Sequence, residues 1–417
     1  MTTVTELDLP AFDYTAPDFS ADRYHQQLAH ARASGWLAQS PLAVLVLDRE
    51  AGEFFLRSRA TAFPGRQIAD FFGVTSGPLR DHIDTNILNL TGEQHRQLRA
   101  LVGPAFTPRA ADRWRPVMRG YLRQLWGDVL PGPGVLPGRC EFMAAVARPY
   151  PALTIAAVLG APAADAPRLQ EWSNLVQRQF DIRALQDELA GIERAVVEVG
   201  DYVTDLLEQR RREPGEDLAS ALLAAAAGGE RLTHAECVNL VVNVLAGAID
   251  TAQSQLGHAL RLFAAHPWQW ARLAADPDLV PRAVQEVLRF EPITPFTARI
   301  CLEDVEYRGV TFPAGTIVAV CAERANREAG QQQDGAPREP GGSDGERFDI
   351  TAERDGRVLT FGAGAHFCLG ANLARAELAE ALTFLAPRMP RLSLAGEPRL
   401  GGVEGIYGIE SLPLRWG

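Results

Sequence analysis

Five cysteines are scattered along the chain, and one of them lies in a segment suited to chemistry. Cys368 stands in the run LTFGAGAHFCLGANLARAEL (359–378), after a loop that contains Gly362 and Gly364 and before a helix-forming stretch. The dipoles at a helix N-terminus favour the thiolate form of a nearby cysteine, and glycines let the backbone approach a flat group closely. We therefore expect a functional thiolate at Cys368. The other four cysteines are interpreted as small buried hydrophobes: Cys140, Cys237, Cys301 and Cys321.

A second set of residues suits proton transfer. Gly247-Ala248-Ile249-Asp250-Thr251 lies within a long apolar stretch, 233–265, that has helical periodicity. A carboxylate and a hydroxyl side by side can pass protons to a reacting group. A helical threonine can also bond back to an earlier carbonyl and open the helix locally. The alternative is that Asp250 and Thr251 form a polar stripe on a core helix.

The segment around Cys368 resembles the haem-binding loop of the cytochrome P450 family, in its soluble bacterial form. That loop reads Phe-x-x-Gly-x-x-x-Cys-x-Gly, and Phe361, Gly364, Cys368 and Gly370 match it position for position. The resemblance implies that Cys368 is the axial thiolate of a haem b, which pushes electron density onto the iron and favours O–O cleavage. It also implies the cytochrome P450 fold, with the haem between the long central helix and the cysteine loop.

Further residues match the family in order along the chain. The resemblance implies that Asp250 and Thr251 are catalytic, that Ala248 lies beside the haem, and that Glu286 and Arg289 form a buried structural pair. The other Glu-x-x-Arg pairs, at 93/96 and 208/211, are interpreted as solvated helix pairs. Four cationic or imidazole side chains are implied to bind the two haem propionates through charge-assisted hydrogen bonds: His95, Arg99, Arg299 and His366.

The substrate pocket is expected in segments equivalent to those that line it in the family. Most of their side chains are apolar, as ligand pockets usually are, with few polar groups to orient the ligand. If Glu404 faces the haem, an amine-bearing substrate such as an amino acid or cyclic peptide becomes the hypothesis. The predicted lining residues are Phe72, Phe180, Val242, Asn243, Ile293, Thr294, Phe296, Glu404, Ile406 and Tyr407.

Composition limits the partners. The chain has 417 residues, 41 Lys+Arg against 52 Asp+Glu, and a net charge of −11, which argues against binding nucleic acid or an anionic membrane. No Cys-x-x-Cys pair, signal peptide or uninterrupted apolar span is visible, so we expect a soluble cytoplasmic monomer without structural zinc. The resemblance implies that electrons come from a ferredoxin and its reductase. A basic cluster is hypothesised to dock this carrier, the alternative being a solvated helix face: Arg96, Arg109, Arg113 and Arg115.

The elements that must position these residues are mainly helices with small β-sheets. A single domain, 1–417, is expected, with a mobile loop at 328–345 and a rigid connector at 131–138. Residues 42–47 and 54–57 are predicted to form a hairpin, and 305–307 with 316–320 a second β-type unit. Helices are predicted at 21–34, 93–105, 164–179, 190–212, 233–265 and 280–290.

Taken with the resemblance, the sequence predicts a haem-thiolate monooxygenase. It would use O2 and two electrons to oxidise, most directly to hydroxylate, a small and largely apolar molecule in bacterial secondary metabolism. One alternative is the same haem diverted to oxidative coupling, nitration or another non-hydroxylating reaction on an aromatic or amine-bearing substrate. A haem-based sensor or carrier is the second alternative, and it would not need the Asp250/Thr251 relay.

Overall fold

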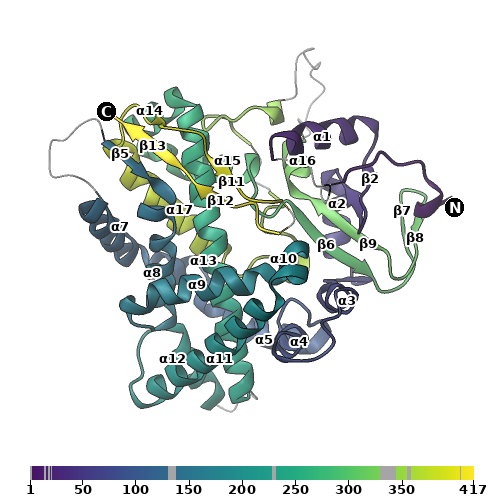
Figure 1. Ribbon diagram of the computed structural model, residues 1–417, viewed down its shortest axis with the longest axis horizontal. Helices are drawn as coiled ribbons and strands as arrows, with labels where there is room; N and C mark the ends of the chain where they lie inside the picture. The colour runs from purple at the N-terminus through teal and green to yellow at the C-terminus, as the bar shows by residue number, and fades with distance from the viewer. Residues whose placement is uncertain are drawn as a thin grey trace. The chain divides into compact units, whose positions relative to one another are not determined.

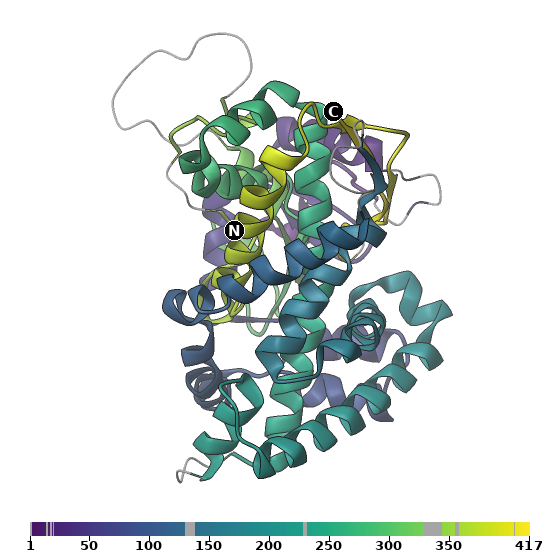
Figure 2. The same ribbon diagram turned by 90° about the vertical axis from the view of Figure 1, so that its left-hand side faces the viewer.

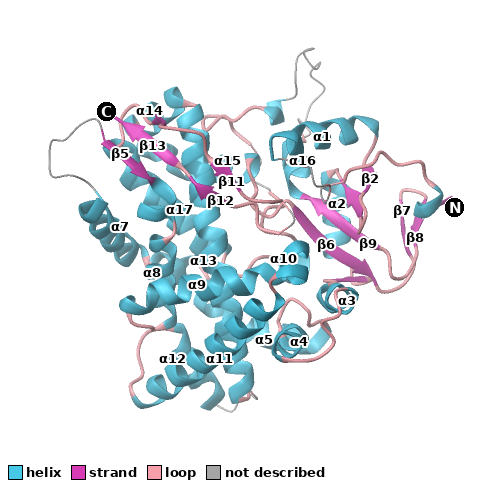
Figure 3. Ribbon diagram, viewed as in Figure 1, coloured by secondary structure: helices cyan, strands magenta, loops and turns pink. Residues whose placement is uncertain are grey.

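The computed structural model describes residues 2–13, 16, 19, 21–129, 138–227, 232–328, 344–354, 358–403 and 405–417. Helices predominate and the strands are short, so the mainly α class is confirmed (Figure 3). The chain forms two compact units, each assembled from separate stretches. Unit 1 comprises 1–64, 276–368 and 400–408, and unit 2 comprises 65–275, 369–399 and 409–417. The single-domain expectation stays a prediction, and residues 131–137 and 329–343 of the two expected loops lie outside the described residues.

Unit 1 is built on a five-stranded sheet with the strand order β2-β3-β9-β6-β4, of which Figure 1 labels β2, β9 and β6. The β3–β9 pair is parallel and the other pairs are antiparallel. A second sheet has the order β1-β8-β7. The strands of unit 1 are β1 (Thr2–Thr3), β2 (Leu37–Gln39), β3 (Val44–Val46), β4 (Thr61–Ala62), β6 (Phe296–Cys301), β7 (Val305–Tyr307), β8 (Val310–Phe312) and β9 (Ile317–Cys321).

Unit 1 also has four helices, α1 (Ala21–Ser34), α2 (Arg49–Arg57), α15 (Val280–Phe290) and α16 (Ala322–Arg327). Of these, α1 packs on β2, α2 and α16 pack on β9, and α15 packs on α16. Phe55 of α2 is buried among Val318 and Val320 of β9 and Leu359 of the cysteine segment. The core of unit 1 therefore joins the sheet, α2 and the segment that leads to Cys368.

The hairpin predicted at 42–47 and 54–57 is wrong, because the second half of it is helical. The Asp48 carboxylate accepts a hydrogen bond from the Ala51 amide at 2.7 Å and so caps the start of α2. Strand β3 instead pairs with β2, which precedes it in the chain. The second β-type unit is also rearranged, since β7 pairs with β8, whereas β9 belongs to the five-stranded sheet.

Unit 2 is mostly helical. Its helices are α3 (Gly65–Phe71), α4 (Pro78–Thr85), α5 (Gly92–Val102), α6 (Pro108–Asp112), α7 (Arg115–Val129), α8 (Pro149–Leu159), α9 (Ala166–Gln177), α10 (Ile182–Asp187), α11 (Leu189–Arg212), α12 (Leu218–Ala227), α13 (His234–Ala265), α14 (Pro267–Ala275) and α17 (Ala371–Leu385). A small sheet has the order β10-β13-β5, formed by Ser393–Leu394, Pro413–Trp416 and Gly138–Glu141. Strand β11 (Arg399–Leu400) pairs with β12 (Ile409–Ser411).

Helix α13 is the long central element of unit 2 (Figure 2). A capping box starts it, since the Thr233 side chain accepts from the Glu236 amide and the Glu236 carboxylate accepts from the Thr233 amide. Among the described residues it is the one helix long and apolar enough to cross a membrane. It packs against α8, α9, α11 and α17 within unit 2, and this packing is that of a core helix.

Candidate active site

The loop before Cys368 closes on itself through backbone hydrogen bonds. The Cys368 amide donates to the Phe361 carbonyl at 2.8 Å, and the Phe367 amide donates to the Gly364 carbonyl at 3.1 Å. The Phe361 and Phe367 rings lie edge to face with centroids 6.3 Å apart. Cys368 is exposed at the end of this loop, and α17 begins three residues later at Ala371. The loop thus presents the Cys368 thiol from a defined backbone position.

Gly364 is required by the packing of this loop on α2. Its φ is +71°, a left-handed conformation that favours glycine, and His366 follows it in the same short helical turn. A Cβ added there would lie 2.8 Å from the Leu56 carbonyl oxygen and 3.0 Å from Arg57 Cα. Backbone from α2 therefore occupies the space that any larger residue would need.

Asn326 fastens the start of the cysteine segment to α16. Its Oδ1 accepts from the Leu359 amide at 2.7 Å, and its Nδ2 donates to Thr360 Oγ1 at 2.9 Å. The Thr360 hydroxyl in turn donates to the Leu288 carbonyl of α15 at 2.6 Å. The sequence analysis gave Asn326 no role, because an amide that bridges two distant segments leaves no periodic signal.

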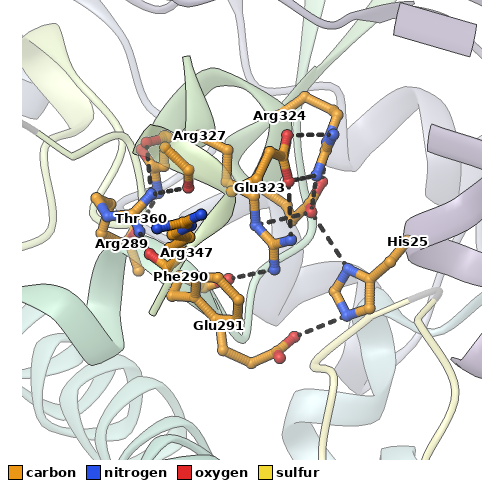
Figure 4. A network of polar contacts seen from close by, with 12 residues as sticks. His25, Arg289, Phe290, Glu291, Glu323, Arg324, Arg327, Arg347 and Thr360 are labelled. Atoms are coloured by element: carbon orange, nitrogen blue, oxygen red, sulfur yellow. Dashed lines mark hydrogen bonds and ion pairs between the residues drawn. The ribbon is translucent and has the colours of Figure 1, made fainter. Parts of the chain in front are cut away.

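The predicted Glu286–Arg289 pair is buried, and Arg289 belongs to the polar network drawn in Figure 4. Two parallel hydrogen bonds of 2.7 and 2.8 Å join the guanidinium to the carboxylate. Arg289 also donates to the carbonyls of Asn326, Gly345 and Arg347. The pair thus reaches the cysteine segment through Asn326, a connection that the spacing of the pair alone did not predict.

His25 of α1 joins the same network, although the sequence analysis assigned it no function. Its ring nitrogens lie 3.3 Å from a Glu291 oxygen and 3.2 Å from a Glu323 oxygen (Figure 4). These two carboxylates raise the pKa of His25 to about 9 against the opposing effect of burial. Glu323 is completely buried, and its partners His25, Arg324 and Arg327 hold its pKa at about 2 despite that burial.

Arg299 is a buried cation on β6 with 3% of its surface exposed. Its guanidinium donates to the Ala298 carbonyl at 2.8 Å, and no carboxylate among the described residues pairs with it. Burial lowers the pKa of Arg299 to about 10. A buried guanidinium without a counter-ion is costly, so this position fits a ligand that supplies a carboxylate.

In unit 2, α13 carries the predicted proton-transfer residues. The Thr251 hydroxyl donates to the Gly247 carbonyl at 2.6 Å, which is the back-bond that the sequence analysis expected. Gly247 is exposed, Ala248 is half-buried, and a Cβ at Gly247 would meet nothing within 4 Å. A stretch of this core helix therefore presents small residues next to the Thr251 hydroxyl.

The Asp250 carboxylate accepts a hydrogen bond from one amide side chain, that of Gln253, which the sequence analysis missed. Gln253 Nε2 donates to Asp250 Oδ1 at 2.7 Å and to Asn174 Oδ1 of α9 at 3.1 Å. Burial raises the pKa of Asp250 to about 6, while the Gln253 hydrogen bond and the charge of Arg178 oppose the rise. The spacing of Asp250 and Gln253 on one helical face was a signal present in the sequence.

His95 and Arg99 stand one turn apart on α5, and His95 is buried. Burial and the positive charge of Arg99 lower the pKa of His95, so the imidazole tends to be neutral. Gly370 precedes α17 with φ −79°, a conformation open to any residue, and a Cβ there would meet nothing within 4 Å. The protein atoms around Gly370 therefore do not by themselves require a glycine there.

Comparison with known proteins connects these features. The family model for cytochrome P450 matches residues 169–385. Luteothin monooxygenase of Streptomyces thioluteus is 37% identical over 411 residues, which cover 98% of this chain and 97% of the relative. Nocardicin C N-oxygenase of Nocardia uniformis subsp. tsuyamanensis is 36% identical over 319 residues, 75% of this chain and 74% of the relative. The crystal structure of CalO2 superimposes with a TM-score of 0.86 at 31% identity, covering 98% and 99% of the two chains.

The chain belongs to the cytochrome P450 family. The family implies haem iron held by a cysteine thiolate, with O2 as co-substrate. The chemistry of the residues described above fits a haem. Cys368 offers a thiol on a closed loop, and the buried Arg299 lacks the carboxylate that a haem propionate would supply.

The predicted pocket residues of this P450 lie in both units, and the two sets are described separately. In unit 1 the Tyr407 amide donates to the Ile293 carbonyl at 2.8 Å, so the segments 293–296 and 406–407 meet. The Tyr24 ring lies 6.0 Å from Tyr407 and 6.2 Å from Phe296. Thr294 and Ile406 are half-buried, and Glu404 lies outside the described residues.

In unit 2 the predicted pocket residues have partners of their own. Val242 is buried, and the Asn243 amide donates to the Asn239 carbonyl one turn earlier at 2.6 Å. Phe72 packs against a hydrophobic cluster that includes Ile83, and Phe180 is half-buried at the end of a 3₁₀ turn. Their roles in a substrate pocket stay predictions.

The predicted basic cluster of this P450 is partly neutralised. Arg96 pairs with Glu93, and Arg115 pairs with Asp112 and Glu380. Arg113 donates to the Glu216 carbonyl at 2.9 Å. Arg109 is exposed and makes no ion pair with the described residues. The uncompensated positive charge of the cluster is therefore that of Arg109 and Arg113.

Proposed function

We propose that this P450 is a haem-thiolate monooxygenase that oxidises a small, largely apolar molecule, with hydroxylation as its ordinary outcome. The observation that carries the proposal is the closed Cys368 loop, clamped by Asn326 and packed on α2 at Gly364, in a chain of this family. Haem iron, when bound, supplies the oxygen chemistry. The protein residues bind that group, exclude bulk water and deliver protons.

The haem-binding residues each contribute one kind of contact. Cys368 Sγ binds the iron as a thiolate. Arg299 provides a buried guanidinium for one propionate, and His95, Arg99 and His366 provide the remaining donors. Because Arg299 is buried without a protein carboxylate, binding a propionate there removes the cost of an unpaired charge. The group assigned is haem b, which is held without covalent attachment.

Asp250 and Thr251 are assigned to proton delivery. Burial places the pKa of Asp250 at about 6, so its carboxylate both takes up and releases protons near neutral pH. The Thr251 hydroxyl is already ordered by its bond to the Gly247 carbonyl. The exposed Gly247 backbone leaves space beside the hydroxyl for a small reactant.

Electrons are assigned to an external ferredoxin and its reductase. Within the basic cluster, Arg109 and Arg113 are the positive charges not paired with a carboxylate of the described residues, and we assign them to attract an acidic carrier. We place the protein in the cytoplasm as a monomer. The names of its relatives, a luteothin monooxygenase and a nocardicin C N-oxygenase, favour a substrate from bacterial secondary metabolism.

A second outcome is favoured by one relative. The protein named nocardicin C N-oxygenase is 36% identical to this chain, and its name places the oxidation at nitrogen. An amine-bearing substrate oxidised at nitrogen is therefore the alternative to hydroxylation at carbon. Both outcomes use the same residues for haem binding and proton delivery.

The test is turnover under labelled oxygen. The holoenzyme, a ferredoxin, its reductase and NADPH are incubated under ¹⁸O2 with apolar compounds first selected because they shift the haem spin state. One ¹⁸O atom bonded to carbon supports hydroxylation, and one bonded to nitrogen supports the alternative. A product without label would contradict monooxygenation. Cys368→Ala, purified in parallel, should form no product.

A further inference from the structure

Asp250 is held by a side chain that belongs to neither the haem-binding set nor the proton-transfer pair. Gln253 lies three residues later on the same face of α13 and is 6% exposed. Its Nε2 lies 2.7 Å from Asp250 Oδ1. A carboxylate can only accept hydrogen bonds when ionised, so the NH2 group, rather than the carbonyl of the amide, must face it.

The side-chain amide of Asn174 holds the side-chain amide of Gln253 in place. The other hydrogen of the Gln253 NH2 group is donated to Asn174 Oδ1 of α9 at 3.1 Å. Ser173, the residue before Asn174, is fully buried and its hydroxyl lies 3.1 Å from both the Leu245 and the Ala246 carbonyls of α13. Helix α9 is therefore anchored to α13 immediately beside the amide pair, which gives the Gln253 side chain one defined position.

We propose that Gln253 is a positioning residue for proton delivery: its amide, oriented by Asn174, holds Asp250 Oδ1 and leaves Oδ2 as the oxygen that exchanges protons. Among the described residues no donor binds Oδ2. One oxygen of the Asp250 carboxylate, Oδ1, is thus hydrogen-bonded to Gln253. The other, Oδ2, is available to hydrogen-bond a water molecule or the Thr251 hydroxyl. This inference rests on the proposed function, because it assigns a partner to Asp250 in that reaction.

The electrostatic surroundings agree with this assignment. Burial favours the neutral carboxyl, and a donor on Oδ1 favours the carboxylate, so the pKa of about 6 is the balance of the two. Arg178 is the charged group whose field reaches Asp250, and it is itself paired with Glu188 at 2.7 Å and with Asp181 at 3.9 Å. On α4, which also packs on α13, burial lowers the pKa of His82 to about 4, so this histidine adds no charge near neutral pH.

The primary measurement reads the protonation of Asp250 without turnover. The infrared band of its protonated carboxyl is followed against pH in the resting holoenzyme and is isolated by subtracting the spectrum of Asp250→Asn. In Gln253→Leu the titration midpoint should rise by about one pH unit, since a hydrogen bond to an ion is worth roughly that shift. Asn174→Ala should move it in the same direction by less.

Two further variants separate positioning from packing. Gln253→Glu keeps the shape but replaces the donor by a second carboxyl, so the midpoint should rise at least as much as in Gln253→Leu. Gln177→Leu makes the same chemical change at a buried glutamine of α9 and should leave the midpoint unchanged. If Gln253→Leu does not fold, the half-buried Asn174 supplies the decisive variant.

Turnover provides the second readout. The measured quantity is the share of electrons recovered in product rather than in hydrogen peroxide, followed against pH. The pH dependence of this share should shift together with the infrared midpoint in Gln253→Leu and should be that of the parent protein in Gln177→Leu. Equal infrared midpoints in the parent protein and both Gln253 variants, with haem content intact, would overturn the inference. Unchanged product yield in Asp250→Asn would instead overturn the proposed proton delivery, and the infrared titration would still decide the Gln253 contact.

Discussion

At the scale of single residues, Gly364 lies at φ +71° with a backbone carbonyl 2.8 Å from the place of a missing Cβ. Gly364→Ala should therefore strain the cysteine loop or push it off α2, at a cost of about 1–3 kcal/mol in the free energy of unfolding. Gly35→Ala is the matched control, since its φ lies outside the left-handed region and a Cβ there would meet nothing within 4 Å. Urea unfolding of both holoenzymes measures the difference, and equal losses would contradict the packing argument.

Arg299 carries a second prediction at this scale. A buried guanidinium whose partner is a haem propionate should contribute about 1.5–3 kcal/mol to haem retention. Arg299→Gln should therefore lose haem to apomyoglobin roughly 10- to 100-fold faster than the parent protein. Arg308→Gln, which removes a guanidinium paired with Asp48 and Glu50, should leave the rate of haem loss unchanged. Equal rates of haem loss in the parent protein and in Arg299→Gln would show that Arg299 does not bind a haem propionate.

Some of these residues could be predicted from the sequence and others could not. Cys368, Gly364 and the Asp250/Thr251 pair stand in short runs whose spacing is specific. Asn326 and Asn174 act through contacts between segments far apart in the chain, and an isolated asparagine has no local pattern that indicates such a contact. Gln253 was accessible through its i+3 spacing from Asp250, but that spacing alone does not distinguish a held carboxylate from a solvated one.

At the scale of elements, His25 joins α1 to the end of α15 and the start of α16. Its folded pKa of about 9 exceeds the ordinary value of 6.5, so the folded state binds the proton more tightly than the unfolded state does. The resulting stability is fully present below about pH 6.5 and is lost as the pH rises through 9. The difference amounts to about 2–3 kcal/mol, because each pKa unit is worth 1.36 kcal/mol and the ring is partly exposed.

The pH dependence of urea unfolding between pH 6 and 10 measures this contribution. His25→Gln should remove most of the decrease in stability across that range. His30→Gln, at an exposed histidine of the same helix, should retain the decrease of the parent protein. A parent protein whose stability is constant from pH 6 to pH 10 would contradict the ionised network.

The helices with a helical periodicity over many residues were predicted correctly. The prediction failed for the short segment after Asp48, where a helix cap favours a helix over a strand. Helices α1 and α15 have the predicted bounds, and α13 begins one residue after its predicted start because Thr233 is the cap. The segment after Asp48 contains two phenylalanines that suit a strand, yet the Asp48 cap and the burial of Ala51 and Phe55 at i and i+4 make it a helix.

At the scale of the whole molecule, the net charge is −11, so a negatively charged partner needs a locally positive surface on which to dock. Arg109→Glu with Arg113→Glu should slow reduction by ferredoxin by about tenfold or more at low ionic strength and weaken its salt dependence. Arg96→Glu should have a smaller effect, because Glu93 already compensates that charge. Unchanged reduction kinetics in the double variant would exclude this docking surface.

The assembly of each unit from distant stretches was beyond local prediction. Unit 1 combines 1–64 with 276–368 and then with 400–408, and Tyr407 meets Ile293 through a backbone hydrogen bond across more than one hundred residues. Periodicity describes single elements and says nothing about such pairings. The family resemblance supplied the overall class, and the comparisons confirmed it.

The central claim is that Cys368 binds haem iron as a thiolate, and the absorption spectrum of the ferrous protein with carbon monoxide tests it most directly. The parent protein should show the strongly red-shifted Soret band of thiolate-ligated haem, and Cys368→Ser should lose it while Cys140→Ser, at a cysteine of β5, retains it. A histidine-like spectrum in the parent protein, or a red-shifted band that survives in Cys368→Ser, would contradict the assignment.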